Sequence, residues 1–261
     1  MYRQFLFDMK SNPVGPNLSV QHSSRWSRLL GAFFAMAFML TSAYAQLATA
    51  TIGGVAGSTG SSNVGLGTFS TPSAVAVDAN GNTYIADTSN NVIRKISSAG
   101  VVSTLVGTGV AGTTNDATAG APTAQFSAPR GLTLNAAGTT IYVSDTGNNS
   151  IRVVALTAIG GTVTGVSTLV PTGTFVFPLG IVADASGNLY VADNGNNIIR
   201  KVVIAGAVVS RLAGSATGAS GFVNGDADTS RFTTPFGVAL NAAGDTLYVA
   251  DYGNHAIRRI T

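Results

Sequence analysis

Four aspartates recur in one local pattern and are the acidic residues best placed to do chemistry. Each follows a Tyr by three positions and precedes an Arg by seven. The sets are Tyr84, Asp87 and Arg94; Tyr142, Asp145 and Arg152; Tyr190, Asp193 and Arg200; and Tyr248, Asp251 and Arg258. A carboxylate can act as a general acid or base, or it can form an ion pair with a guanidinium. A reaction needs one such constellation, however, and four equivalent copies indicate a structural role. We expect the aspartates to accept backbone N–H groups in turns, and the arginines to pair with them or lie over the Tyr rings.

The chain offers few other catalytic groups. The chain has no Cys and no Glu, and His255 is the only His after residue 45. A zinc site built on His needs about three imidazoles, and no Gly-x-Ser-x-Gly nucleophile turn is present. Asn224, Asp226 and Asp228 place oxygen side chains at alternate positions, as calcium loops do, but no Glu follows them. A solvated loop is the alternative reading. We expect no cofactor, and catalysis is not favoured.

Residues 1–45 have the pattern of a secretory signal peptide. Arg25 and Arg28 precede the apolar run 29–40, and Ala43 and Ala45 form an Ala-x-Ala cleavage pattern. This run is shorter than the roughly 20 residues of a membrane span. An uncleaved anchor or a buried helix are the alternatives, and Met9 is an alternative start. We expect cleavage after Ala45, a secreted or periplasmic protein, and no membrane attachment after cleavage.

The chain from residue 46 carries no net charge. Its ten Lys or Arg residues balance ten Asp residues, so the formal charge of +3 belongs to the leader. Nucleic-acid binding requires a concentrated basic surface, and no nucleic-acid partner is expected. Because the domain has no Cys, its stability must come from a packed core rather than from disulfides.

The Asp pattern belongs to a longer repeat. The four aspartates are 58, 48 and 58 residues apart, and a Phe-x-x-Pro precedes each one. Each unit reads as short strands with two-residue alternation, joined by Gly-containing turns. We expect repeats at about 69–107, 126–170, 175–214 and 232–261, within a domain spanning 46–261. The fourth unit ends without its last strand, and residues 48–55 resemble the strand that begins at Val101. That strand can complete the last unit and close a ring, which removes exposed sheet edges.

The stretch "GVALNAAGDTLYVADYGNHAIRRI" and its three relatives resemble the NHL repeat, a blade module of β-propellers. The resemblance implies an all-β propeller. With the four repeats of this chain, we expect four four-stranded blades, with the N-terminal strand completing the last blade. NHL propellers commonly have six blades, so a fragment or part of an assembly is the alternative to closure. Innermost strands crowd together in such a ring, which suits Ala74, Gly131, Gly180 and Gly237.

Residues at which the copies differ are the candidates for binding. Long loops at 107–125 and 213–231 and the Asp-containing turns fall on one end of the blades, and loops on a rigid scaffold commonly bind ligands. Ser73, Arg130, Leu179 and Phe236 follow the four prolines and should surround the mouth of the channel. Tyr252 and His255 replace Thr or Asn in the last turn. The predicted binding patch is Arg130, Phe236, Tyr252 and His255, with ordinary surface variation as the alternative.

Two classes of function remain. The first is an exported binding scaffold for a protein, peptide or glycan, as the resemblance to NHL domains implies. The second, also implied by related propellers, is a metal-dependent lyase or a lactonase-like enzyme. A catalytic site should show Asp residues gathered at the channel mouth, whereas a binding site should show apolar or aromatic exposure on the long-loop end.

Overall fold

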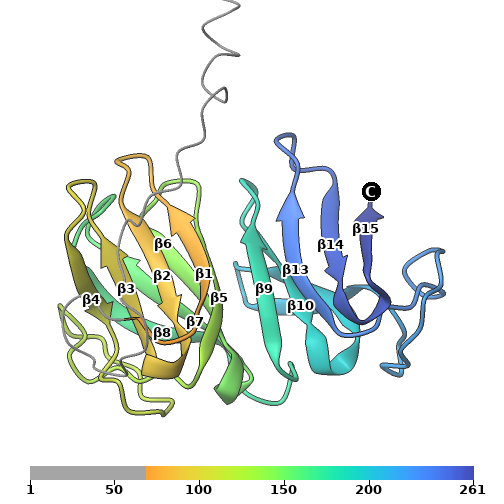
Figure 1. The fold of residues 1–261 in the computed structure, drawn as a ribbon, viewed down its shortest axis with the longest axis horizontal. Helices are drawn as coiled ribbons and strands as arrows, with labels where there is room; N and C mark the ends of the chain where they lie inside the picture. The colour runs from red at the N-terminus through yellow and green to blue at the C-terminus, as the bar shows by residue number, and fades with distance from the viewer. Residues whose placement is uncertain (1–68) are drawn as a thin grey trace, which may run out of the picture. The chain divides into compact units, whose positions relative to one another are not determined.

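The computed structural model describes residues 69–261, which form four antiparallel sheets (Figure 1). Blade 1 contains β1 (Pro72–Val77), β2 (Thr83–Asp87), β3 (Val92–Ile96) and β4 (Val102–Val106). Blade 2 contains β5 (Pro129–Leu134), β6 (Thr140–Asp145), β7 (Ser150–Leu156) and β8 (Val163–Val170). Blade 3 contains β9 (Pro178–Ala183), β10 (Asn188–Asp193), β11 (Ile198–Val203) and β12 (Val208–Ala213). Blade 4 contains β13 (Pro235–Leu240), β14 (Leu247–Asp251) and β15 (Ala256–Ile260).

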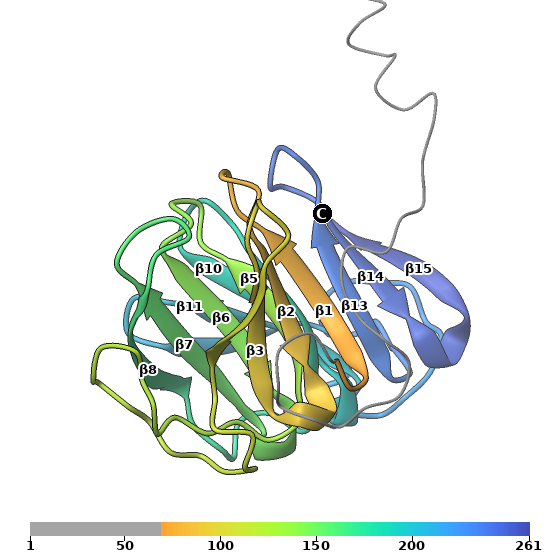
Figure 2. The ribbon, with the colours of Figure 1, turned by 60° about the vertical axis from the view of Figure 1, so that its left-hand side comes forward.

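Strand order within each blade follows the chain, so each blade is a meander, as the sheet of β5 to β8 shows in Figure 2. The first strands contact one another in succession: β1 contacts β5, β5 contacts β9, and β9 contacts β13. Neighbouring blades therefore pack face to face around the first strands. The predicted all-β propeller of four blades is confirmed. The closing strand at 48–55 lies outside the described residues, so ring closure stays a prediction.

In each blade, the turn between the first and second strands is stabilised by hydrogen bonds with side chains near the turn itself. In blade 1, Asp78 Oδ1 accepts the backbone N–H groups of Asn80 and Asn82 at 2.9 Å each, and the Tyr84 hydroxyl donates to Asp78 Oδ2 at 2.9 Å. Burial and this hydrogen bond raise the pKa of Tyr84 to about 12. Gly81 follows with φ +79°, a conformation that glycine adopts without strain. Blade 3 repeats the arrangement with Asp184, and blades 2 and 4 use Asn135 and Asn241.

The core formed by residues 69–261 contains three hydrophobic clusters, one between each two blades that follow one another in the chain. Tyr84 and Ile93 of blade 1 pack with Leu132 of blade 2 in the first cluster. Blades 2 and 3 form the second cluster, and blades 3 and 4 form the third. The alternation along the strands of blades 2 and 3 thus supplies one apolar face to the preceding blade and one to the following blade. The stability of each blade depends on its neighbours.

The predicted crowding of the first strands is found at two of its glycines. A Cβ on Gly131 would lie 2.1 Å from the Leu179 carbonyl oxygen, and one on Gly180 would lie 2.7 Å from the Phe236 carbonyl oxygen. A Cβ on Gly237 would meet only the Ala250 Cβ, at 3.7 Å. Gly237 is crowded from one side only: its Cα would lie 2.8 Å from a Cβ on Gly180, whereas within the described residues no first strand approaches the position of its own Cβ.

The outward face of blade 4 is exposed, and so is the first strand of blade 1, although Ile85 and Ile96 on the same face of blade 1 are buried. Ile93, Ile151 and Ile199 are fully buried at equivalent positions, whereas Ile257 of blade 4 is 72% exposed. On blade 1, Val75 is 67% exposed. Among residues 69–261, no helix is long and apolar enough to cross a membrane.

Candidate functional site

The four repeated aspartates are buried and fully engaged. Each Oδ1 accepts the backbone N–H of the residue that follows the Phe of the Phe-x-x-Pro, as Ser127 donates to Asp145 at 2.7 Å. Each Oδ2 accepts from an Asn side chain three residues later, at 2.7 to 2.9 Å. Burial raises the pKa of Asp145, although bonds from Ser127, Asn148 and Arg152 oppose it. These carboxylates hold each blade's entry loop against its second strand.

The repeated arginines complete the same arrangement. Arg94, Arg152, Arg200 and Arg258 form ion pairs with the Asp of their own blade at 2.5 to 3.0 Å. Three guanidinium groups also lie over the Phe of the Phe-x-x-Pro rather than over the Tyr. The distances to the ring centroid are 5.1 Å from Arg152 to Phe126, 5.7 Å from Arg200 to Phe175 and 5.0 Å from Arg258 to Phe232. Buried ion pairs of this kind are costly to break, because one charge is left unpaired.

In the first three blades, the turn after the Asp connects the blade to the next one. The last Asn of the turn has φ near +50° and accepts a backbone N–H from the residue before the next blade's Pro. Asn91 thereby binds Ala128 at 2.8 Å, Asn149 binds Phe177 at 2.7 Å, and Asn197 binds Thr234 at 2.8 Å. We call this bond the blade latch.

A second bond lies beside the latch. The residue directly after the Asp donates to the carbonyl of the next blade's Pro, from Thr88 to Pro129 at 2.8 Å, from Thr146 to Pro178 at 2.7 Å and from Asn194 to Pro235 at 3.1 Å. In blade 4 the corresponding residues are Tyr252 and His255. Their side chains are exposed and form no hydrogen bond within residues 69–261. The side chains at these two positions hold the next blade in blades 1 to 3, whereas in blade 4 they are available on the surface.

The four residues that were predicted to surround the channel mouth lie together in one cavity. Ser73, Arg130, Leu179 and Phe236 line a cavity of about 250 Å³ formed by the four first strands. The Ser73 hydroxyl donates to the Arg130 carbonyl at 2.9 Å. Phe236 is 43% exposed, and its ring lies 6.0 Å from that of Tyr252, tilted by 44°. Phe236 and Tyr252 therefore form an exposed aromatic pair that extends from the mouth onto blade 4.

The two remaining members of the predicted patch lie at its edges. Arg130 is exposed at the start of β5, and His255 is exposed at the end of the last turn. Within residues 69–261, neither side chain forms a hydrogen bond or a cation–π pair with the Phe236 or Tyr252 side chain.

The sequence matches the model of the teneurin NHL domain over residues 57–261. The chain belongs to this family. Its NHL propeller also resembles several solved structures. One is a nidogen/laminin complex, with 23% identity over 73% of this chain and 60% of the other, at a TM-score of 0.55. Another is an auxiliary nutrient binding protein from Bacteroides ovatus, with 16% identity over 75% of this chain and 49% of the other, at a TM-score of 0.59.

A third similar structure is virginiamycin B lyase from Staphylococcus aureus, with 17% identity over 73% of this chain and 52% of the other, at a TM-score of 0.50. At these identities the likeness shows the fold alone. This chain spans about half to three fifths of the length of these proteins. No curated protein matches its sequence.

Hydrogen bonds within the candidate calcium loop of this NHL propeller stabilise its conformation. Asp226 Oδ1 accepts the backbone N–H groups of Asp228 and Thr229, and the Thr229 hydroxyl. The hydrogen bonds from Thr229 and Asp228 lower the pKa of Asp226. Asp228 pairs with Arg211. Within residues 69–261, no three His, Cys, Asp or Glu side chains are grouped to hold a metal ion.

Two exposed aromatic residues were missed by the sequence reasoning. Phe177 stands before Pro178, where the other blades have Thr71, Ala128 and Thr234, and is exposed. Phe222 is exposed in the loop before blade 4, with the Arg258 guanidinium 4.9 Å from its ring centroid. Comparing the residues before each Pro would have singled out Phe177. Phe222 has no counterpart in the repeats, so no repeat pattern points to it.

Proposed function

We propose that this NHL propeller is an exported binding module that recognises an apolar segment of a protein, peptide or glycan through its long-loop end. The observation that carries this proposal is the exposed Phe236 and Tyr252 pair at the rim of the channel-mouth cavity. Contiguous exposed apolar surface on a monomer commonly marks an interaction site. Aromatic side chains supply much of the energy of such sites, because their large rings lose little rotamer freedom on binding.

Further exposed apolar residues lie on the same end of the blades. They are Val110, Phe177, Phe222 and Val223, in the loops that join successive blades. Arg130, at the mouth, adds a cation that can bind a carboxylate or a backbone carbonyl of the partner. An apolar surface with one guanidinium suits a protein or peptide best, and a glycan that stacks on the rings remains within the proposal.

The alternative is a metal-dependent lyase or lactonase-like activity. It requires acidic or imidazole ligands gathered near the channel. The cavity at the mouth is lined by no Asp or His among the described residues, and the Asp of each turn is engaged in its ion pair. No observation in the structure favours this alternative over binding.

Export is part of the proposal and rests on the leader pattern of residues 1–45, which lie outside the described residues. The neutral charge of the chain from residue 46 supports an extracellular or periplasmic protein or glycan partner over nucleic acid.

The experiment isolates partners from the exported proteome on the immobilised protein and then measures the affinity of each purified partner by calorimetry. We expect Phe236→Ala with Tyr252→Ala to weaken binding by roughly tenfold or more, as loss of an aromatic hot spot does. Tyr248→Ala is the matched control, because Tyr248 is an exposed aromatic residue on the sheet face of the same blade. Equal affinity of all three proteins would overturn the proposed site.

Thermal unfolding in EDTA and then in excess calcium tests the alternative. An ion that binds only the folded state raises the melting temperature. The binding proposal predicts no shift, and a rise of several degrees would return attention to residues 224–228 and to a metal-dependent activity.

A further inference from the structure

A pocket of about 300 Å³ lies between the loop at 107–125 and the last two strands of blade 2. Four hydroxyl side chains, one proline and one arginine line it: Thr113, Ser150, Arg152, Thr168, Pro171 and Thr172. Ser150 and Arg152 are buried and form its base, whereas the residues from the loops are exposed and form its opening. The lining includes no residue of the Phe236 and Tyr252 patch, so the pocket is a separate candidate site.

The Arg152 guanidinium fixes the loop that forms one wall of this pocket. Its Nη1 donates to Asp145 at 3.0 Å and to the Gln125 carbonyl at 2.8 Å. Its Nη2 donates to the Thr114 carbonyl at 2.9 Å and to the Asn115 side chain at 2.8 Å. The loop is thus held before any ligand arrives, and a ligand binding there has little ordering of the protein to offset.

The fifth N–H of the same guanidinium has no acceptor. Nε of Arg152 is buried and has no hydrogen-bond partner within residues 69–261. In blades 1 and 3 the corresponding Nε donates to the Asp of its own blade, as Arg94 does to Asp87 at 2.9 Å. A buried donor without a partner costs stability. The lining of the pocket therefore includes a donor that an oxygen atom of a ligand would satisfy.

Ser150 is the second unpaired polar group of this pocket. It is 3% exposed, and its hydroxyl forms no hydrogen bond within the part of the chain that the structure describes. The other three blades carry Val92, Ile198 and Ala256 at this position. An apolar side chain therefore suits the fold there, and a buried hydroxyl without a partner lowers stability. Packing does not account for the serine, whereas binding of a polar ligand does.

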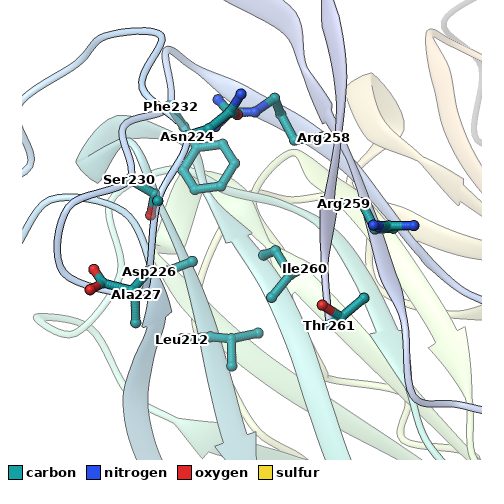
Figure 3. Close-up of a pocket in the computed structure, with 12 residues that line it drawn as sticks. Leu212, Asn224, Asp226, Ala227, Ser230, Phe232, Arg258, Arg259, Ile260 and Thr261 are labelled. Atoms are coloured by element: carbon teal, nitrogen blue, oxygen red, sulfur yellow. The ribbon is translucent and has the colours of Figure 1, made fainter.

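The buried polar side chains of a larger cavity are already paired (Figure 3). This cavity, of about 370 Å³, lies between the loop at 224–227 and β15. The Ser230 hydroxyl accepts the Gly214 backbone N–H at 3.0 Å, and Arg258 pairs with Asp251 at 3.0 Å. These groups need no ligand, so the argument from unpaired groups applies to the blade 2 pocket and not to this cavity.

The charge of the blade 2 pocket favours a neutral ligand. Arg152 is paired with Asp145, and no other Asp, His, Lys or Arg lines the pocket among the described residues. An anion would find a cation that is already neutralised, and a cation would find no free carboxylate. The pocket therefore offers hydrogen bonds rather than a net charge.

The hydrogen-bonding groups match those of a sugar. The hydroxyls of Thr113, Ser150 and Thr172 form no hydrogen bond within residues 69–261, and each can both donate and accept. Sugar hydroxyls do the same, and the Pro171 ring adds apolar surface for the C–H groups of a sugar ring. The volume lies at the lower end of the roughly 300–1,000 Å³ of small-molecule pockets, which suits one sugar unit.

We propose that the blade 2 pocket binds one neutral sugar unit of a glycan. A sugar hydroxyl pairs with Ser150, a sugar oxygen accepts from Nε of Arg152, and the threonines at the opening bind further hydroxyls. This site is independent of the proposed function, because the Phe236 and Tyr252 patch can fail its own test while this pocket passes.

Amide shifts in nitrogen-15 NMR spectra test the proposal as glucose, galactose, mannose or N-acetylglucosamine is added. At least one of these sugars should shift the amides of Thr113, Ser150 and Thr172. We expect a dissociation constant on the order of 1 mM, because a few hydrogen bonds to a neutral ligand support only weak binding. Sodium phosphate is the charged comparison and should leave these amides unchanged.

Ser150→Val copies the Val92 of blade 1 and separates binding from stability. It should weaken sugar binding by about fivefold or more, as loss of one hydrogen bond does. Its melting temperature should equal or exceed that of the unmodified protein, because an apolar side chain replaces an unpaired hydroxyl. Ser210→Val is the matched control, since Ser210 is exposed on β12 of blade 3, and it should keep both properties.

Weaker sugar binding together with undiminished stability supports the proposal, because removal of a purely structural serine would lower the melting temperature. Absence of sugar-induced shifts at the three amides would show that the pocket holds water only. Shifts caused by phosphate instead would make it an anion site, and unchanged affinity of Ser150→Val would place the sugar elsewhere. Each of these three results overturns the assignment.

Discussion

The side chain of Asn197 in blade 3 accepts the backbone N–H of Thr234 in blade 4 at 2.8 Å, and its amide donates to the Gly218 carbonyl at 3.0 Å. His255 occupies the equivalent position in blade 4 with nearly the same backbone, at φ +52° against +54°. Its side chain is exposed. The same turn thus holds a neighbouring blade at one position and faces solvent at the other.

This pair of residues gives a matched test of the blade latch. Asn197→Ala should lower the free energy of unfolding by roughly 1–3 kcal/mol, because a partly buried N–H and a carbonyl lose their partners. His255→Ala carries the same strain of positive φ without losing a latch, so the difference between the variants measures the latch. Urea denaturation of both supplies the two values, and equal losses would show that the latch adds nothing to stability.

Two isoleucines give the corresponding test of blade packing. Ile199 is fully buried between blades 3 and 4, whereas Ile257 at the equivalent place is 72% exposed. Ile199→Ala should cost about 2–5 kcal/mol of stability, and Ile257→Ala should stay within about 0.5 kcal/mol. Urea denaturation of the two variants measures both losses of stability. A large loss for Ile257→Ala would mean that the outward face of blade 4 is covered in solution.

A third comparison concerns the first strands. Gly180→Ala places a methyl group 2.7 Å from the Phe236 carbonyl oxygen and 2.8 Å from the Gly237 Cα. We expect a loss of about 1–3 kcal/mol, as for other overpacked cores. Gly237→Ala meets no such contact and should be neutral or stabilising by up to about 1 kcal/mol, because it restricts the unfolded chain. A clash at both positions, seen as matching drops in melting temperature, would contradict the described packing of blade 4.

The aspartates in the turns between the first and second strands of blades 1 and 3 predict that the protein loses stability in acid. Burial would raise the pKa of Asp78 and Asp184, but the hydrogen bonds from Asn82 and Asn188 and from the Tyr hydroxyls prevail, and both pKa values lie below the ordinary 3.8. Each carboxylate therefore contributes stability above pH 3.8 that is lost as the pH falls through its folded-state pKa.

Asp78→Asn with Asp184→Asn copies the side chains that blades 2 and 4 carry at Asn135 and Asn241. The melting temperature of this variant should fall less than that of the unmodified protein between about pH 5 and pH 2. Parallel curves would show that these two carboxylates do not account for the acid sensitivity.

The sequence could predict the propeller because four copies of one pattern marked the same strands and turns. It also predicted the engagement of Asp87 and its equivalents, since an Asp before an Asn-rich turn has few other structural uses. The blade latch could not be predicted. Asn91 is sufficiently explained by its left-handed backbone, and nothing in one blade's sequence shows that its side chain reaches Ala128. The exposure of Ile257 could not be predicted for a related reason. The sequence around Ile257 resembles that around Ile199, and the two residues differ only in whether a neighbouring blade packs against them.

The blade latch is a hydrogen bond from a backbone N–H of the following blade. It therefore does not depend on the side chain of the residue that donates it. Ala128, Phe177 and Thr234 are held by the same bond in nearly the same conformation, with φ between +43° and +50°. Substitutions at these three places can therefore alter the chemistry displayed around the channel mouth while the scaffold keeps its geometry. At each of these residues the backbone supports the neighbouring blade and the side chain determines the surface, so the surface can vary without a loss of support.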